Sequence, residues 1–149
     1  MVVINMNKVM IIFVLVASVY AGNALDEFLA PLTQGQKCAN PIDAYDVTSF
    51  TVTPWPPTRR TKITSTSVGT FNQAETITGI KVTVYLDGKS FYTETVPESG
   101  TYAAGQSATF TYAETVPFIA PKGNYTIKGG LVNSSGTQVS CWEVSFSLN

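Results

Sequence analysis

The chain of 149 residues is 44% hydrophobic and 13% charged, a balance that suits one globular domain and excludes both a disordered chain and a multidomain enzyme. Nine basic and ten acidic residues leave a net charge of −1, so we expect no nucleic-acid partner. The sequence has no histidine and so lacks the usual general base and the commonest zinc ligand, which excludes most familiar hydrolases and predicts neither a bound metal nor a cofactor.

The start of the chain has the pattern of a secretory signal peptide. Lys8 precedes nine consecutive apolar residues at 9–17, and a stretch of small residues follows. A bilayer-spanning helix needs about 20 apolar residues, so the run is short for an uncleaved membrane anchor, which is the alternative. We predict cleavage after Ala21 or Ala24 and a location in the secretory pathway, either outside the cell or in a lysosomal or vacuolar lumen.

The chain divides into three predicted segments: a signal peptide at 1–24, a linker at 25–37 and a single domain at 38–149. The two cysteines, Cys38 and Cys141, lie near the ends of this domain, and an oxidising compartment favours a disulfide between them. Glycosylation sequons begin at Asn124 and Asn133 and agree with that compartment, although such triplets also arise by chance.

The body of the chain is predicted to be all strand, because polar and apolar residues alternate and no stretch shows the 3.6-residue period of an amphipathic helix. The predicted strands lie at about 47–53, 62–70, 79–86, 89–96, 106–115, 125–132 and 137–148. Asp87-Gly88 predicts a tight hairpin turn, whereas the prolines at 54–57 and the sequence 97–100 predict breaks. Gly129-Gly130 predicts a strand position that another backbone approaches. Strands at this spacing predict an immunoglobulin-like, two-sheet antiparallel β-sandwich.

The charged residues show no catalytic constellation. A glycoside hydrolase would need a carboxylate pair, for which Glu94, Glu98 and Glu114 are the candidates, but their spacing carries no signal. They are more simply solvated side chains, and we predict no catalytic residues.

Two further features leave alternatives open. The basic cluster of Arg59, Arg60 and Lys62 suits either contact with an anionic lipid surface or plain solvation. Trp55, between two prolines, suits either a packed lid over the edge of the sandwich or an anchor for a partner.

Several motifs follow one another along residues 38–148. The segment 121–127, PKGNYTI, precedes the segment 139–144, VSCWEV, and proline motifs at 52–57, 96–98 and 116–118 precede both. In this order they resemble the ML family of lipid-recognition domains, which includes phosphatidylglycerol/phosphatidylinositol transfer proteins and the lysosomal sterol carrier of Niemann-Pick disease. An immunoglobulin domain instead places its core tryptophan between its two cysteines, whereas here Trp142 follows the second.

The resemblance implies two sheets that splay apart to hold a lipid, without any catalytic group. It implies an apolar cavity lined by Ile80, Val82, Val84, Phe110, Tyr112, Leu131 and Trp142, and rim residues Val96, Phe118 and Ile119 that contact the ligand or a membrane. Without the resemblance, the lining residues are ordinary sandwich core. The chain departs from better-known members by lacking two further disulfides, since Trp55 stands where one cysteine would be and residues 99–105 contain none.

The leading hypothesis is therefore a soluble, monomeric lipid-binding and transfer protein that carries a sterol or a phospholipid and touches membranes transiently. The alternative is a secreted sandwich that presents a lipid, or itself, to a receptor or a hydrolase. A lipid-directed hydrolase is a third hypothesis, but no nucleophile and base can be named for it.

Overall fold

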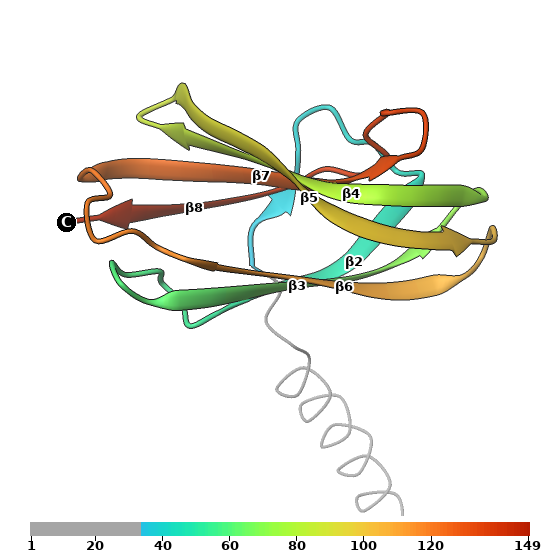
Figure 1. The fold of residues 1–149 in the computed structure, drawn as a ribbon, viewed down its shortest axis with the longest axis horizontal. Coiled ribbons are helices and arrows are strands. Elements are labelled where there is room, and N and C mark those ends of the chain that lie inside the picture. Colours follow the sequence, from blue (N-terminus) through green and yellow to red (C-terminus); the bar gives the residue numbers. More distant parts are fainter. Residues whose placement is uncertain (1–33) are drawn as a thin grey trace, which may run out of the picture. The chain divides into compact units, whose positions relative to one another are not determined.

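The computed structural model describes residues 34–149, which form two antiparallel β-sheets that face each other (Figure 1). The five-stranded sheet has the order β1 (Gln36–Lys37), β8 (Trp142–Leu148), β7 (Gly123–Asn133), β4 (Glu75–Leu86) and β5 (Lys89–Tyr102). The three-stranded sheet has the order β2 (Tyr45–Thr53), β3 (Lys62–Phe71) and β6 (Ser107–Thr115). The predicted all-β, immunoglobulin-like sandwich is confirmed. Residues 34–149 include no helix with the length and apolar character needed to cross a membrane.

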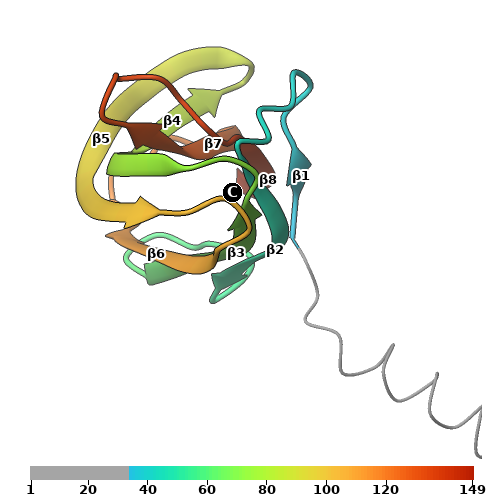
Figure 2. The ribbon, with the colours of Figure 1, turned by 90° about the vertical axis from the view of Figure 1, so that its right-hand side faces the viewer.

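The predicted signal peptide, its cleavage positions and most of the predicted linker lie outside the described residues. The last two linker residues, Gln36 and Lys37, form β1 and pair with Glu143 and Trp142 of β8. Figure 2 shows β1 beside β8 along one side of the sandwich and β5 along the other. This part of the predicted linker is therefore an edge of the folded sheet.

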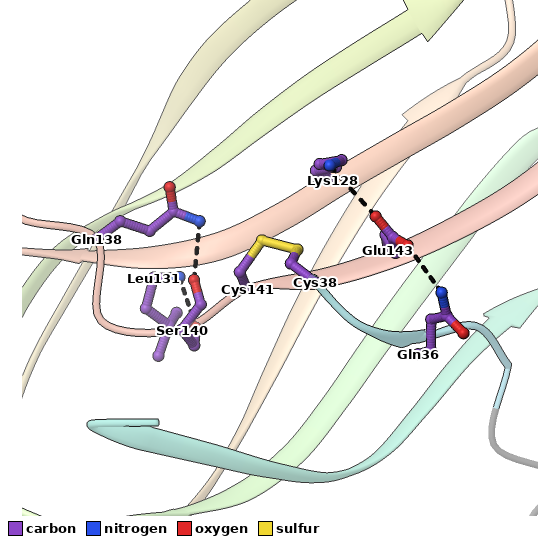
Figure 3. The surroundings of a disulfide bond; sticks show 8 residues. All are labelled: Gln36, Cys38, Lys128, Leu131, Gln138, Ser140, Cys141 and Glu143. Atoms are coloured by element: carbon purple, nitrogen blue, oxygen red, sulfur yellow. Dashed lines mark hydrogen bonds and ion pairs between the residues drawn. A yellow bond between two sulfur atoms is a disulfide. The ribbon is translucent and has the colours of Figure 1, made fainter. Parts of the chain in front are cut away.

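The predicted disulfide is confirmed and lies directly after β1 (Figure 3). Cys38 and Cys141 have their Cα atoms 5.5 Å apart, and the Cys38 N–H donates to the Cys141 carbonyl at 3.3 Å. On β8, Glu143 accepts a hydrogen bond from the Gln36 side chain at 2.9 Å and pairs with Lys128 at 3.3 Å. The hydrogen bond from Gln36, reinforced by Lys128, holds the pKa of Glu143 below its ordinary value.

The hairpin between β4 and β5 forms as predicted. Asp87 and Gly88 have φ angles of 47° and 79°, so both central residues of the turn adopt the positive φ that a type I′ turn requires. The prediction that residues 97–100 break the strand is wrong, because β5 continues to Tyr102. Pro97 is tolerated there because β5 is an edge strand, which has no neighbour on one side to need the missing N–H donor.

The last strand is shorter than predicted. It begins at Trp142, and the preceding residues Gln138 and Ser140 make isolated bridges to Val132 and Asp43. Alternate residues of β8 face inward, since Trp142, Val144 and Leu148 are buried.

Aromatic side chains fill one end of the sandwich. Tyr45 and Phe71 are each at most 1% exposed and pack with ring centroids 4.8 Å apart, and Tyr102 and Phe110 complete the cluster. The Tyr45 hydroxyl donates to the Ala108 carbonyl at 3.0 Å, and burial raises the pKa of Tyr45 to about 12. The opposite end carries the C-terminus, the β4–β5 turn and the β6–β7 loop (Figure 1).

Candidate functional site

A cavity of about 80 Å³ lies between the two sheets, next to the aromatic cluster; we call it the inner cavity. Its walls come from both sheets, with Phe50, Val52 and Phe110 on one and Val82, Leu131 and Trp142 on the other. Apart from the hydroxyls of Ser65, Ser67, Ser140 and Tyr112 and the carboxyl of Glu114, its side chains are apolar. The packing of the sandwich is therefore incomplete at this position.

A second and larger space of about 410 Å³, the outer cavity, lies toward the open end of the sandwich. It includes Phe91 and Tyr92 at the start of β5 and residues 116, 117 and 119–121 of the β6–β7 loop. The two cavities share the lining residues Ile63, Glu114, Ile127 and Phe146. They therefore adjoin, and together they lead from the middle of the sandwich to a surface loop.

The structure places eight of the ten predicted lipid-contact residues on the walls of these cavities. The inner cavity is lined by Ile80, Val82, Phe110, Tyr112, Leu131 and Trp142. The outer cavity is lined by Val84 and Ile119. Their contact with a lipid stays a prediction.

The other two, Val96 and Phe118, line neither cavity. Val96 lies within β5 opposite Ile80, and the strand continues past it instead of breaking at 97–100 as predicted. Phe118 and Ile119 do sit on the β6–β7 loop and are 64% and 73% exposed.

Two adjacent glycines shape the inner cavity in different ways. A Cβ at Gly130 would lie 2.0 Å from the Ser140 carbonyl oxygen, so the predicted close backbone approach is confirmed there. A Cβ at Gly129 would meet no atom within 4 Å, and Gly129 lines the cavity. The sequence pattern identified the Gly-Gly pair but did not indicate that Gly129 leaves space in the inner cavity.

Trp55 lies against the wall of the inner cavity. Its ring packs edge-on against Phe146 with centroids 6.0 Å apart, and the side chain is 39% exposed. Phe146 in turn stacks on Tyr125 at 5.4 Å. This packing agrees with the interpretation of Trp55 as a lid over the edge of the sandwich.

Polar side chains connect the two edge strands β5 and β6. The Tyr112 hydroxyl bonds to a carboxylate oxygen of Glu94 and lies 2.8 Å from Oε2 of Glu114, while the Tyr92 hydroxyl donates to Glu94 Oε2 at 2.8 Å. Burial, and then these two carboxylates, raise the pKa of Tyr112 well above its ordinary value, so its hydroxyl keeps its proton. The interpretation of Glu94 and Glu114 as simply solvated side chains is wrong.

The basic cluster after β2 divides into different roles. Arg59 donates to the carbonyls of Ala120 and Asn149 at 2.8 and 2.6 Å, which fastens the β6–β7 loop and the C-terminus. The Arg60 guanidinium lies 5.6 Å from the centre of the Phe118 ring. Among the described residues, no basic side chain lines either cavity and no three acidic or cysteine side chains gather around a metal position.

The two sequons differ in their surroundings. The Asn133 side chain is half-buried, with Nδ2 donating to Glu75 at 3.0 Å and Oδ1 accepting the N–H of Thr137 at 3.0 Å. Asn124 is exposed. Glycosylation of either asparagine stays a prediction.

Comparison with known proteins connects this geometry to a family. Residues 33–148 match the family model described as ML domain. No curated protein sequence matches the chain significantly.

Solved structures share the fold at low sequence identity. A Niemann-Pick type C2 protein from the Japanese carpenter ant superimposes with a TM-score of 0.59 at 7% identity, covering 77% of this chain and 98% of that one. The C-terminal domain of wzt gives 0.55 at 11% identity, with 77% and 75% covered. The sporulation control protein Spo0M from Bacillus subtilis gives 0.54 at 15% identity, with 71% of this chain and 49% of that one covered. At these identities the likeness concerns the fold alone.

Proposed function

Because this chain belongs to the ML-domain family, we propose that it is a lipid-binding protein that holds the apolar part of one lipid between its two sheets. The observation that carries the proposal is the pair of adjoining cavities, which are walled almost entirely by apolar side chains and open beside the β6–β7 loop. An apolar space of this kind stays dry and favours an apolar occupant.

The volumes fit a chain or ring system that enters from the outer cavity. The outer cavity of about 410 Å³ lies within the range of roughly 300 to 1,000 Å³ that is typical of small-molecule pockets. The inner cavity of about 80 Å³ holds only the end of such a ligand, since benzene binds in an engineered cavity of about 150 Å³.

Burial of lipid surface supplies a gross free energy on the scale of micromolar binding. Removing roughly 300 Å² of sterol or acyl surface from water gives about 7 to 8 kcal/mol at about 25 cal/mol per Å². Micromolar affinity corresponds to about 8 kcal/mol, so this burial reaches that range before the costs of association are counted.

The finer proposal is a monomeric carrier that moves a sterol or a phospholipid through transient contact with membranes of the secretory or lysosomal lumen. Support comes from the exposed Phe118 and Ile119, which lie on the loop that borders the outer cavity. The cation of Arg60 beside Phe118 complements an anionic membrane surface.

We propose no catalytic activity. Two of the serine hydroxyls in the inner cavity have backbone partners, with Ser65 donating to the Tyr112 carbonyl at 3.2 Å and Ser140 accepting the Leu131 N–H at 2.9 Å. Within residues 34–149, neither of these two serine hydroxyls is hydrogen-bonded to a carboxylate that could act as a general base and activate it as a nucleophile.

The test separates binding from delivery. Protein secreted by a eukaryotic host is extracted into organic solvent for mass spectrometry, and lipid-free protein is assayed for uptake of labelled sterol and phospholipid. We expect one lipid per protein. An empty extract together with no uptake by folded, disulfide-bonded protein would overturn the proposal.

Delivery is tested with Phe118→Asp, which places a charge on the exposed loop. We expect this variant to exchange lipid between anionic vesicles at least about tenfold more slowly, with unchanged binding at equilibrium. Val68→Asp is the matched control, because Val68 is also partly exposed but lies on β3, away from the loop. Equal slowing by both variants would contradict a specific membrane contact, and full binding without any vesicle exchange would favour presentation to a protein.

A further inference from the structure

Side chains of β5 and β6 make three close oxygen–oxygen contacts that have only two hydrogens among them. Three close oxygen–oxygen contacts join Tyr92 to Glu94, Tyr112 to Glu94 and Tyr112 to Glu114. The two tyrosines supply only two hydroxyl hydrogens, and ionised carboxylates supply none. One carboxylate oxygen therefore faces Tyr112 without a donor of its own.

Glu114 is the member of this group that a ligand can reach. It is the one charged side chain, among the described residues, that lines the cavities, and it lies where the inner and outer cavities meet. Its Oε2 faces Tyr112, whereas Oε1 has no hydrogen-bond partner within residues 34–149. Both oxygens of Glu94 are already taken up by tyrosines.

The surroundings of Glu114 disfavour a second negative charge. No basic side chain from the described part of the chain lines either cavity, so a buried anion would face a carboxylate without compensation. A hydroxyl or an ammonium group instead donates the missing hydrogen to the carboxylate. A hydrogen bond to this charged acceptor is stronger than one between two neutral groups.

We propose that Glu114, positioned by Tyr112, selects the class of lipid by accepting a hydrogen bond from its buried polar group, so that lipids ending in a hydroxyl or an amine bind and those ending in a carboxylate do not. This inference rests on the proposed lipid-binding function and adds the chemistry of the polar end.

The test compares a saturated fatty alcohol, the primary amine and the fatty acid of the same chain length. Each competes with Nile red, an uncharged fluorescent dye, for lipid-free wild-type protein at a pH of about 8, where the free carboxyl is ionised. We expect the alcohol and the amine to compete at least about tenfold better than the acid. In Glu114→Gln, which keeps the shape of the side chain but removes its charge, we expect the ratio to fall below about threefold.

Glu98→Gln is the matched control, since it removes the same charge from β5 at a residue that lines neither cavity. It should keep the wild-type ratio. Equal competition by alcohol and acid in the wild type would overturn the inference, as would the same loss of preference in both variants. Competition by the amine alone would overturn the part of the inference that concerns hydroxyl groups. If Nile red and all three lipids fail to bind, the proposed function itself fails.

Discussion

Replacing Gly129 by valine tests whether the inner cavity is empty space that a ligand uses. Gly129 pairs with Val82 on β4 and Trp142 on β8, so a side chain there shares their inward face. A Cβ at this position meets no atom within 4 Å. At roughly 24 cal/mol per Å³, a cavity of about 80 Å³ costs about 2 kcal/mol of stability.

The substitution should therefore change stability and binding in opposite directions. Filling the cavity should stabilise the lipid-free protein by about 1 to 2 kcal/mol, which raises Tm by about 4 to 8 °C in a domain of this size. The valine side chain displaces about three carbon atoms of the ligand, each worth about 0.8 kcal/mol, so affinity should fall about 50-fold.

The measurements are thermal unfolding of lipid-free protein and titration with labelled lipid. Thr109→Val is the control, because it introduces the same side chain at an exposed position of β6. A less stable Gly129→Val variant would show that the space is not open to a side chain. A more stable variant that binds lipid as the wild type does would show that the ligand does not enter the inner cavity.

Two further predictions concern stability. Changing Cys38 and Cys141 together to Ala opens a loop of 103 residues, which the chain-entropy model values at about 4.7 kcal/mol, so calorimetry under oxidising conditions should show Tm lower by about 15 to 20 °C; an unchanged Tm would refute this contribution. Burial raises the pKa of Tyr45 to about 12, so the stability that its neutral form contributes is complete below pH 10 and is lost as pH rises from 10 to 12. Tyr45→Phe should remove that part of the alkaline loss in urea unfolding, and parallel wild-type and variant curves would contradict the assignment.

Local patterns were sufficient where each residue's neighbours decide its conformation. Alternation over 79–86 predicted a strand that the structure contains within β4, and Asp87-Gly88 predicted the turn because its φ angles are a local property. The predicted break at Pro97 was wrong because the cost of a missing N–H depends on whether another strand lies beside it. The sequence does not show that β5 is an edge.

The residues' own pattern predicts which side chains face the interior but does not show that a cavity lies between the sheets. Period-two alternation places Val82, Phe110 and Trp142 on inner faces, yet the same pattern describes a filled core. The space depends on Gly129, whose missing side chain matters only because no residue of the facing sheet fills the gap. The link between Glu94 and Tyr112 was also out of reach, since it joins edge strands of two sheets whose relative position no short-range pattern encodes.

The two sheets stay together around the cavity because contacts outside the core join them along one side of the sandwich. Gln34 donates its N–H to the Phe50 carbonyl at 2.7 Å and accepts the Trp142 indole N–H at 2.7 Å, which joins β2 to β8. The neighbouring disulfide contributes about 4.7 kcal/mol in the chain-entropy model, which exceeds the cost of about 2 kcal/mol for the empty inner cavity. On the other side, side chains connect the sheet edges, through Tyr112 and Glu94. The closed sides of the sandwich thus offset the cost of its unfilled middle, which the proposed alternation between loaded and empty states requires.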